Sequence, residues 1–275
     1  MRSRLRQISQ QLGLASAMVL HTLLSGAVGD SAGASLSTTV PPPEFRLARL
    51  AYNDSAAMGG FGFGRRGGGS WTTDAPEAEY HLSQGIRRLT RINTIDPEKD
   101  DVVLPVQPLD PKLSEYPFLY AVEVGRWYLD DAEAAALRDY LLRGGLLMVD
   151  DFHGSLQWEG FMESMRRVFP EREVVDIPAD NEIFRMAYDL QKQVADQVQI
   201  PGVFALMGGR TYEQDGVDPK WRGIFDDEGR LMVVINFNMD LGDAWEHADS
   251  PEYPQPLTAL AYRFAISYAL YAMTH

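Results

Sequence analysis

The sequence predicts an α/β fold, a three-layer sandwich in which helices cover both faces of a mostly parallel sheet. Short apolar runs alternate along the chain with amphipathic helical segments, which is the pattern of βαβ units. The apolar run 146–150 follows a helix that ends at paired glycines, as a buried central strand would. The acidic turn 226–229 lies between two further apolar runs and predicts a late β-hairpin.

The individual elements follow from periodicity, capping residues and breakers. Helices are predicted where apolar residues recur at helical spacing, with Thr73 or Asp74 as the first cap, Asp130 as the second and Gly144 as a stop. A short helix is expected at 181–190, no assignment is made for 191–209, and 239–255 is expected to be a loop. The predicted strands are 45–52, 102–106, 117–124, 146–150, 173–177, 221–225 and 230–238, and the main helices are 74–91, 130–143, 155–169 and 256–275.

Length and composition predict one domain with a substantial core, because 45% of the 275 residues are hydrophobic. The net charge of −14 disfavours nucleic-acid binding and suits a cationic ligand or a metal, although a solvated acidic surface gives the same count. There is no cysteine. Thiol nucleophiles, thiolate metal ligands and disulfides are therefore excluded.

The first residues have the pattern of an export signal. A basic start precedes a mostly apolar stretch, 12–28, and a small-x-small cleavage pattern ends at Ala34. We expect a cleaved signal peptide at 1–34, a Pro-rich linker at 35–43 and a single α/β domain at 44–275. The alternative is an anchor that stays attached, but the apolar run is shorter than the roughly 20 residues needed to span a bilayer. The protein is accordingly predicted to be periplasmic or secreted, with no spanning helix after cleavage.

The end of the central strand carries the first candidate site. Asp150, Asp151 and His153 come where α/β sheets usually bind ligands. Neighbours in a strand point to opposite faces, so Asp151 and His153, two apart, are expected to act together, as metal ligands or as a base and its orienting group. The alternative is structural, with Asp151 capping the next helix. Ser155 is expected to be a helix N-cap, because no Gly-x-Ser-x-Gly elbow surrounds it.

Two other segments could bind a ligand. The glycine-rich stretch 59–71 lies between a strand and a helix, where backbone N–H groups can hold an anion, but it lacks the Lys-Ser/Thr ending of a P-loop. It is equally compatible with a flexible loop or a lid. Asp240, Asp243 and His247 have spacing compatible with oxygen and nitrogen ligands, and they follow a predicted strand, so they could face the same crevice.

Four ordered motifs resemble a bacterial family of domains of unknown function, the family numbered 4159. They are Gly67-Gly68-Gly69-Ser70-Trp71, the segment from Arg143-Gly144-Gly145 to Asp150-Asp151-Phe152, Gly242-Asp243-Ala244-Trp245, and Tyr271 to His275. The resemblance covers residues 44–275 and implies a flavodoxin-like sandwich similar to class I glutamine amidotransferases. It implies no reaction. If 146–154 is the elbow that holds the amidotransferase cysteine, glutaminase chemistry cannot occur here.

Two functional hypotheses follow, and whether the protein is an enzyme stays open between them. The first is an exported, non-catalytic module that binds a small molecule, a sugar or a protein partner. The second is a metal-assisted hydrolase that uses Asp151, His153 and the 240–247 loop. No cofactor is predicted from the residues themselves, and a divalent metal is compatible with them. Asp151 and His153 are the candidate catalytic residues, and the candidate ligand-binding residues are Gly67, Gly68, Gly69, Trp71, Arg126, Trp127, Asp243 and Trp245.

Overall fold

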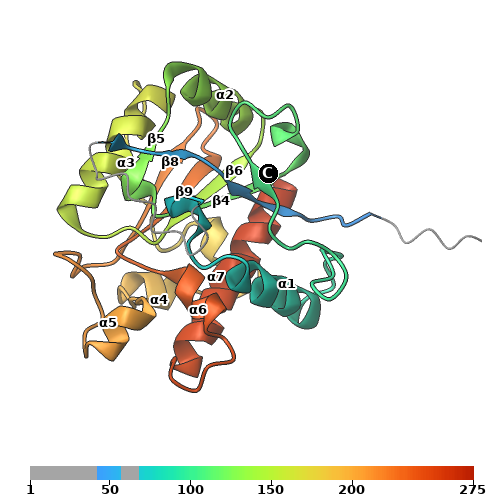
Figure 1. Cartoon of the computed structure of the whole chain (residues 1–275), viewed down its shortest axis with the longest axis vertical. Coiled ribbons are helices and arrows are strands. Elements are labelled where there is room, and N and C mark those ends of the chain that lie inside the picture. The colour runs from blue at the N-terminus through green and yellow to red at the C-terminus, as the bar shows by residue number, and fades with distance from the viewer. Residues whose placement is uncertain (1–41, 57–67) are drawn as a thin grey trace, which may run out of the picture. The chain divides into compact units, whose positions relative to one another are not determined.

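A seven-stranded sheet forms the centre of the computed structural model, which describes residues 42–56 and 68–275 (Figure 1). The strand order is β3-β1-β4-β6-β9-β8-β7. The first five of these pair in parallel, while β8 is antiparallel to both β9 and β7. The strands are β1 (Leu47–Leu50), β3 (Pro105–Val106), β4 (Phe118–Val122), β6 (Leu146–Asp150), β7 (Val175–Asp176), β8 (Lys220–Phe225) and β9 (Leu231–Phe237).

The topology confirms the predicted α/β class, the mostly parallel sheet and the late hairpin. Counted along the chain, the parallel strands stand in the order 2-1-3-4-5, which is the flavodoxin-type order. The parallel strands β4, β6 and β9 are almost wholly apolar, as expected for a sheet buried on both faces. A separate two-stranded sheet pairs β2 (Asn53–Asp54) with β5 (Trp127–Tyr128).

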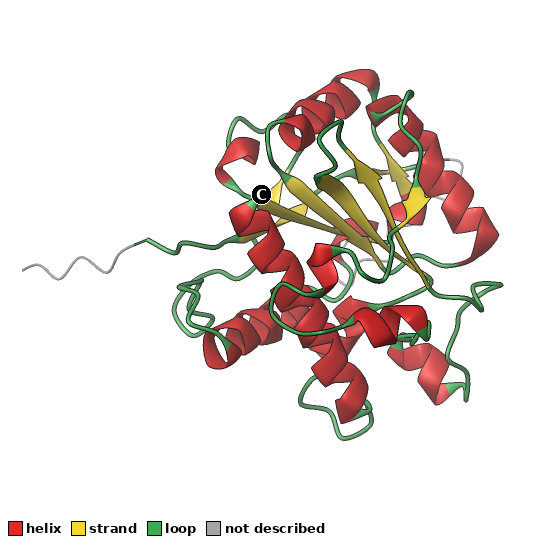
Figure 2. Cartoon of the chain, turned by 180° about the vertical axis from the view of Figure 1, so that it is seen from behind, coloured by secondary structure: helices red, strands yellow, loops and turns green. Residues whose placement is uncertain are grey.

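Helices cover both faces of the sheet (Figure 2). On one face α2 (Asp131–Leu142) and α3 (Gly154–Val168) pack on the odd side chains of the central strands, such as Leu147 and Val149. On the other face α1 (Glu77–Leu89), α6 (Leu241–Glu246) and α7 (Gln255–Thr274) cover Tyr120 and Met148. This alternation along one strand gives the domain its two apolar cores.

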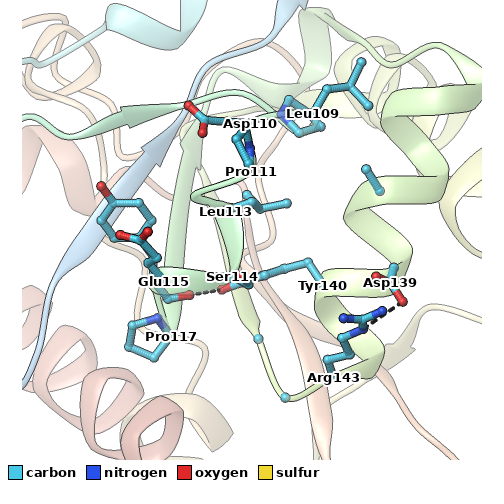
Figure 3. A pocket seen from close by; sticks show the side chains of 15 residues that line it. Leu109, Asp110, Pro111, Leu113, Ser114, Glu115, Pro117, Asp139, Tyr140 and Arg143 are labelled. Atoms are coloured by element: carbon cyan, nitrogen blue, oxygen red, sulfur yellow. Dashed lines mark hydrogen bonds and ion pairs between the residues drawn. The ribbon is translucent and has the colours of Figure 1, made fainter.

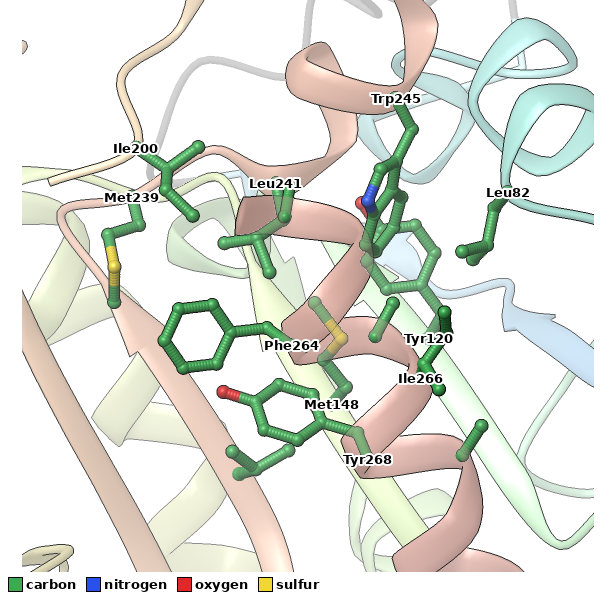
Figure 4. Packing of buried hydrophobic residues seen from close by; sticks show 14 of the residues in the cluster. Leu82, Tyr120, Met148, Ile200, Met239, Leu241, Trp245, Phe264, Ile266 and Tyr268 are labelled. Atoms are coloured by element: carbon green, nitrogen blue, oxygen red, sulfur yellow. The ribbon is translucent and has the colours of Figure 1, made fainter. Parts of the chain in front are cut away.

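The core beneath α6 and α7 is rich in aromatic rings (Figure 4). Trp245 lies against Tyr120 with ring centroids 5.5 Å apart, and Phe264 stacks on Trp221 at 5.3 Å. Both tryptophans are buried. This packing fixes α6 against the carboxyl end of the sheet, where the candidate site lies.

Several local predictions were wrong. The first helix begins at Glu77 with Pro76 as N-cap, so neither Thr73 nor Asp74 caps it. The segment 181–190 forms only a short 3₁₀ helix, η5 (Glu182–Phe184), and the expected loop 239–255 contains α6. His153, not Ser155, is the N-cap of α3, because the Ser155 side chain donates to Asp215 instead.

The unassigned region before the hairpin contains two short helices, α4 (Gln191–Ala195) and α5 (Val203–Met207). Pro42–His275 forms one compact unit, while the predicted signal peptide and most of the predicted linker lie outside the described residues. Within residues 42–56 and 68–275, no helix combines the length and apolar character needed to cross a membrane.

Candidate functional site

Acidic side chains gather at the carboxyl ends of the central strands. Glu123 directly follows β4, Asp150 ends β6 and Asp151 follows it, and Asp240 comes three residues after β9. The carboxyl ends of parallel strands meet at one edge of a sheet, which is where open α/β sheets bind ligands. Asp74 joins this edge from the loop that precedes α1. We call Asp74, Asp151 and Asp240 the aspartate triad.

The aspartate triad places one carboxylate oxygen from each residue within 4.8 Å of the other two. Asp151 and Asp240 are only 8% and 3% exposed, and the Asp74 Oδ2 atom is buried as well. The three residues come from separate segments of the chain, so the tertiary fold alone brings them together. Carboxylates this close repel one another when ionised, and a low-dielectric surrounding strengthens that repulsion.

Two members of the triad have an unusual backbone conformation. Asp74 has a φ of 63° and Asp151 a φ of 51°, both in the left-handed region. Non-glycine residues adopt this region rarely, and such strain concentrates at functional sites. Because Asp151 leaves the strand conformation, the alternation expected for Asp150 and Asp151 breaks down at this point. The Asp150 carboxylate interacts electrostatically with both Asp151 and Asp240, so it also belongs to the acidic group.

The Asp150 side chain connects the end of β6 to the start of α6. Its Oδ2 accepts hydrogen bonds from the backbone N–H groups of Leu241 (2.7 Å) and Gly242 (3.0 Å), at the start of α6. Its Oδ1 is buried and accepts no hydrogen bond. Asp240 is the N-cap of the same helix, since its Oδ1 accepts from the Asp243 N–H at 2.7 Å. The first turn of α6 thus fixes two carboxylates at the site.

Two glycines leave room for the acidic group. A Cβ on Gly242 would lie 2.3 Å from Asp74 Oδ2 and 2.6 Å from the Tyr120 hydroxyl. A Cβ on Gly202 would lie 2.6 Å from a carboxylate oxygen of Glu213, 2.8 Å from one of Asp240 and 3.2 Å from one of Asp243. The carboxylates therefore continue past the triad, from Asp74 on one side to Glu213 on the other.

Two histidines border this group. His153 is buried, and its Nε2 lies 3.4 Å from Asp151 Oδ1 while its Nδ1 has no hydrogen-bond partner. Burial lowers the pKa of His153, which favours the neutral imidazole. His247 is more exposed, with Nε2 3.6 Å from Asp243 Oδ1, and these two residues and Glu246 form a second set with metal-ligand spacing.

The electrostatics of the site favour proton uptake or cation binding. Burial first, and neighbouring carboxylates second, raise the pKa of Asp74, Asp150, Asp151 and Asp240 well above the ordinary value. The same causes raise the pKa of Glu123 to about 8, despite an ion pair with Arg126 at 3.2 Å. A bound cation would remove this penalty by pairing with the ionised carboxylates.

The comparison with protein families gives a clear match. The model of a domain of unknown function, DUF4159, matches residues 46–273. The chain belongs to this family. A search of curated proteins finds no match to it. The family match spans every residue of the acidic group and states no reaction.

Of the predicted site residues of this DUF4159 domain, Asp151, His153, Asp240, Asp243 and His247 come together at the carboxyl edge of the sheet. Arg126 borders them through Glu123. Asp151 does not cap α3. The N-cap is His153, whose backbone N–H donates to the Gln157 side-chain oxygen.

Two of the three tryptophans predicted to bind a ligand are buried in the apolar cores, and the third is half-buried. Trp127 and Trp245 are 1% and 0% exposed and belong to the apolar cores, so neither presents a face to a ligand. The Trp127 indole donates to the Phe161 carbonyl at 3.1 Å. Trp71 is half-buried in the 3₁₀ turn η2 (Ser70–Thr72).

The glycine-rich segment is described only from Gly68 onward, and Gly67 lies outside the described residues. The Ser70 N–H lies 3.2 Å from the Asp54 carboxylate, so this backbone donor is already occupied. Gly69 has a φ of 92°, which explains a glycine at the start of the turn. An anion site at 68–70 gains no support from these contacts.

Sequence reasoning missed Asp74, Glu123 and Glu213. Glu123 had an available signal, because it follows an apolar strand as Asp151 does. Asp74 resembled a helix cap, and Glu213 lies in a region without periodicity, so neither had a local pattern that distinguishes it from a surface acid.

A pocket of about 560 Å³ lies at the opposite edge of the sheet (Figure 3). It is formed by the segment before β4 and the end of α2, with Leu109, Tyr140 and Arg143 among its lining residues. Because Pro117 and Gly145 precede β4 and β6, this pocket faces the amino ends of the strands. It shares no residue with the acidic group.

Proposed function

We propose that this DUF4159 domain binds a divalent cation, with Asp74, Asp151 and Asp240 as its protein ligands. The observation that carries the proposal is the convergence of three carboxylate oxygens, from three separate segments, within 4.8 Å. Hard divalent cations such as Mg²⁺, Mn²⁺ and Ca²⁺ take oxygen ligands of this type.

Two further observations support a cation. The buried Asp150 Oδ1 and the buried hydroxyl of Tyr120 have no hydrogen-bond partner. Both residues also interact electrostatically with aspartates of the acidic group. Native proteins rarely leave buried polar atoms unpaired unless an ion or water satisfies them. The buried Arg49 opposes the rise in pKa that burial causes at Asp74, but it also forms an ion pair with Glu79, so it does not by itself neutralise three ionised aspartates.

The test is direct titration of purified protein with Mn²⁺, Mg²⁺, Ca²⁺ and Zn²⁺ by calorimetry, after dialysis against chelator. We expect wild type to bind one of the oxygen-preferring ions, and Asp151→Asn and Asp240→Asn to weaken binding by tenfold or more. Asp227→Asn is the matched control, because that side chain is 83% exposed at the hairpin turn. If wild type shows neither binding heat nor a rise in melting temperature with any ion, the proposal is wrong.

A metal-assisted hydrolase is the second candidate, and the contact between His153 and Asp151 favours it. The bound ion would supply Lewis-acid chemistry. His153 would take up the proton of an attacking water at a ring nitrogen, and its lowered pKa keeps the imidazole neutral for that role near pH 7. A screen of ester and phosphoester substrates should then show turnover that His153→Asn abolishes while cation affinity stays unchanged. Turnover that survives in His153→Asn would exclude this role.

We retain export as part of the proposal, on the N-terminal pattern in residues 1–34. In a periplasmic ligand-binding or interaction module, the cation would either be the ligand itself or join the protein to another ligand. Cell fractionation, with N-terminal sequencing of the mature protein, tests this part. We expect the mature protein to be periplasmic and to begin at residue 35. A full-length protein in the cytoplasm would contradict this.

The amidotransferase-like relationship also stays a proposal. Asp151 lies at the strand-to-helix junction between β6 and α3 with a φ of 51°, the kind of position in which the resemblance implies a cysteine. On this proposal the domain replaces a thiol nucleophile by a carboxylate that holds an ion. Glutaminase activity is then absent, and an assay for ammonia release from glutamine tests that directly.

A further inference from the structure

We propose that Arg49 is a positioning residue, which holds the Asp74 segment in the geometry that binds the cation. The inference rests on the proposed cation site and adds a residue that does not touch the ion. Arg49 lies in β1 and is fully buried, in a sheet whose other central positions are almost wholly apolar.

The guanidinium of Arg49 spans the loop that precedes Asp74. Its Nη1 donates to the backbone carbonyls of Trp71 at 3.0 Å and Thr73 at 2.7 Å. Its Nε donates to Glu79, which lies in the first turn of α1. One side chain therefore ties the sheet to both ends of a short connection, with Asp74 between them. The planar fork of arginine suits this set of acceptors, whereas lysine has a single nitrogen.

Asp74 needs such support because its backbone is in the left-handed region. A non-glycine residue stays there only when the surrounding structure over-determines it. The carbonyl of Thr73 is the acceptor immediately before Asp74, so its bond to Arg49 fixes the peptide from which the aspartate projects.

A second contact links Arg49 to the same point. The guanidinium carbon lies 5.0 Å from the centre of the Tyr120 ring. The Tyr120 hydroxyl and Asp74 Oδ2 both lie close to Gly242, 2.6 Å and 2.3 Å from the position that a Cβ would occupy. Arg49 thus supports Asp74 through the backbone and through the tyrosine beside the carboxylate.

The charge of Arg49 is compatible with a cation nearby. Glu79, 2% exposed, forms an ion pair with it, and this pair is neutral overall. The Arg49 charge also acts on the triad, where it opposes the rise in pKa that burial causes at both Asp74 and Asp151. A buried charge costs free energy unless it is paired and hydrogen-bonded, so an arginine used only to fill the core would be a poor choice.

The test is a double-mutant cycle on the affinity for Mn²⁺, measured by calorimetry with full-length protein. We expect Arg49→Lys and Asp74→Asn each to raise Kd by tenfold or more, and the double variant to be no weaker than Asp74→Asn alone. Such non-additivity is what action through Asp74 requires, and a merely structural loss would not produce it. Arg138→Lys is the matched control, because Arg138 also joins a backbone carbonyl, that of Val168, to a glutamate but lies on the α2 side of the domain.

If Arg49→Lys does not fold, Glu79→Gln decides the question. It weakens the anchor at Nε and leaves the two carbonyl bonds in place, so a Kd about threefold higher is expected, again only when Asp74 is present. A folded Arg49→Lys or Glu79→Gln protein with wild-type Kd, or effects that add to those of Asp74→Asn, would overturn the inference. Wild-type protein that binds no cation would instead refute the proposed function on which it rests.

Discussion

Replacement of Glu123 by glutamine should stabilise the cation-free domain at alkaline pH and not at acidic pH. In the folded protein the pKa of Glu123 is about 8, against an ordinary value of 4.5, chiefly because the carboxyl group is buried. The folded state therefore holds the proton more tightly than the unfolded state. As pH rises from 4.5 to 8, the unfolded state ionises first and wild type loses stability. Glutamine has no proton to lose, so the variant escapes this loss.

The size of the effect follows from the two pKa values. Each pKa unit corresponds to about 1.4 kcal/mol, so complete ionisation would cost about 5 kcal/mol. The side chain is 18% exposed and lies 3.2 Å from Arg126, so solvent and relaxation would reduce the measured cost. We expect Glu123→Gln to be more stable than wild type by about 2–4 kcal/mol at pH 8.5 and within about 0.5 kcal/mol at pH 5.

The assay is urea unfolding followed by circular dichroism, in chelator, at half-unit steps from pH 5 to 8.5. Glu163→Gln is the control, because that carboxylate is 59% exposed on α3 and should show no comparable trend. A difference between Glu123→Gln and wild type that stays constant with pH would refute the reasoning, since it would mean that Glu123 titrates alike in both states.

Three further outcomes are expected. Trp245→Ala should lower the free energy of unfolding by about 3–5 kcal/mol, measured by urea titration, because the ring is fully buried against Tyr120; a small effect would mean that the residue is not part of the core. Gly242→Ala should weaken cation binding at least tenfold in calorimetry, because the new Cβ would lie 2.3 Å from Asp74 Oδ2; wild-type affinity would show that Asp74 can move freely. Chelator should lower the melting temperature more at pH 8 than at pH 5, since carboxylates with raised pKa values are neutral in acid and need the cation only when ionised; an equal shift at both pH values would contradict that.

The sequence was sufficient for elements whose signals are local. Apolar runs, the Asp130 cap, the Gly144 stop and the acidic turn before Arg230 predicted the sheet, α2 and the hairpin correctly. The Asp130 capping box, completed by Glu133, is a signal contained within four residues. Such features depend on the chain near them and need no knowledge of the fold.

The site was only partly predictable because its geometry depends on contacts between distant segments. Asp150 accepts from Leu241, 91 residues later, and this bond helps to form the helix α6 that the sequence had suggested was a loop. The left-handed conformation of Asp151 breaks the strand alternation, and no pattern in the surrounding residues predicts it. Trp245 follows an acidic run that resembles a binding loop, yet the packing of α7 places it in the core.

The two oxygens of Asp150, which ends β6, and of Asp240, the N-cap of α6, have different surroundings. Asp150 Oδ2 accepts a hydrogen bond from the first backbone N–H of α6, while its Oδ1 has no hydrogen-bond partner. Asp240 Oδ1 accepts from the Asp243 N–H, and its Oδ2 lies close to Gly202. An asparagine offers only one oxygen, so it can keep the backbone bond or the second role, but not both. A change of Asp150 or Asp240 to asparagine is therefore expected to weaken either the start of α6 or the role of the second oxygen.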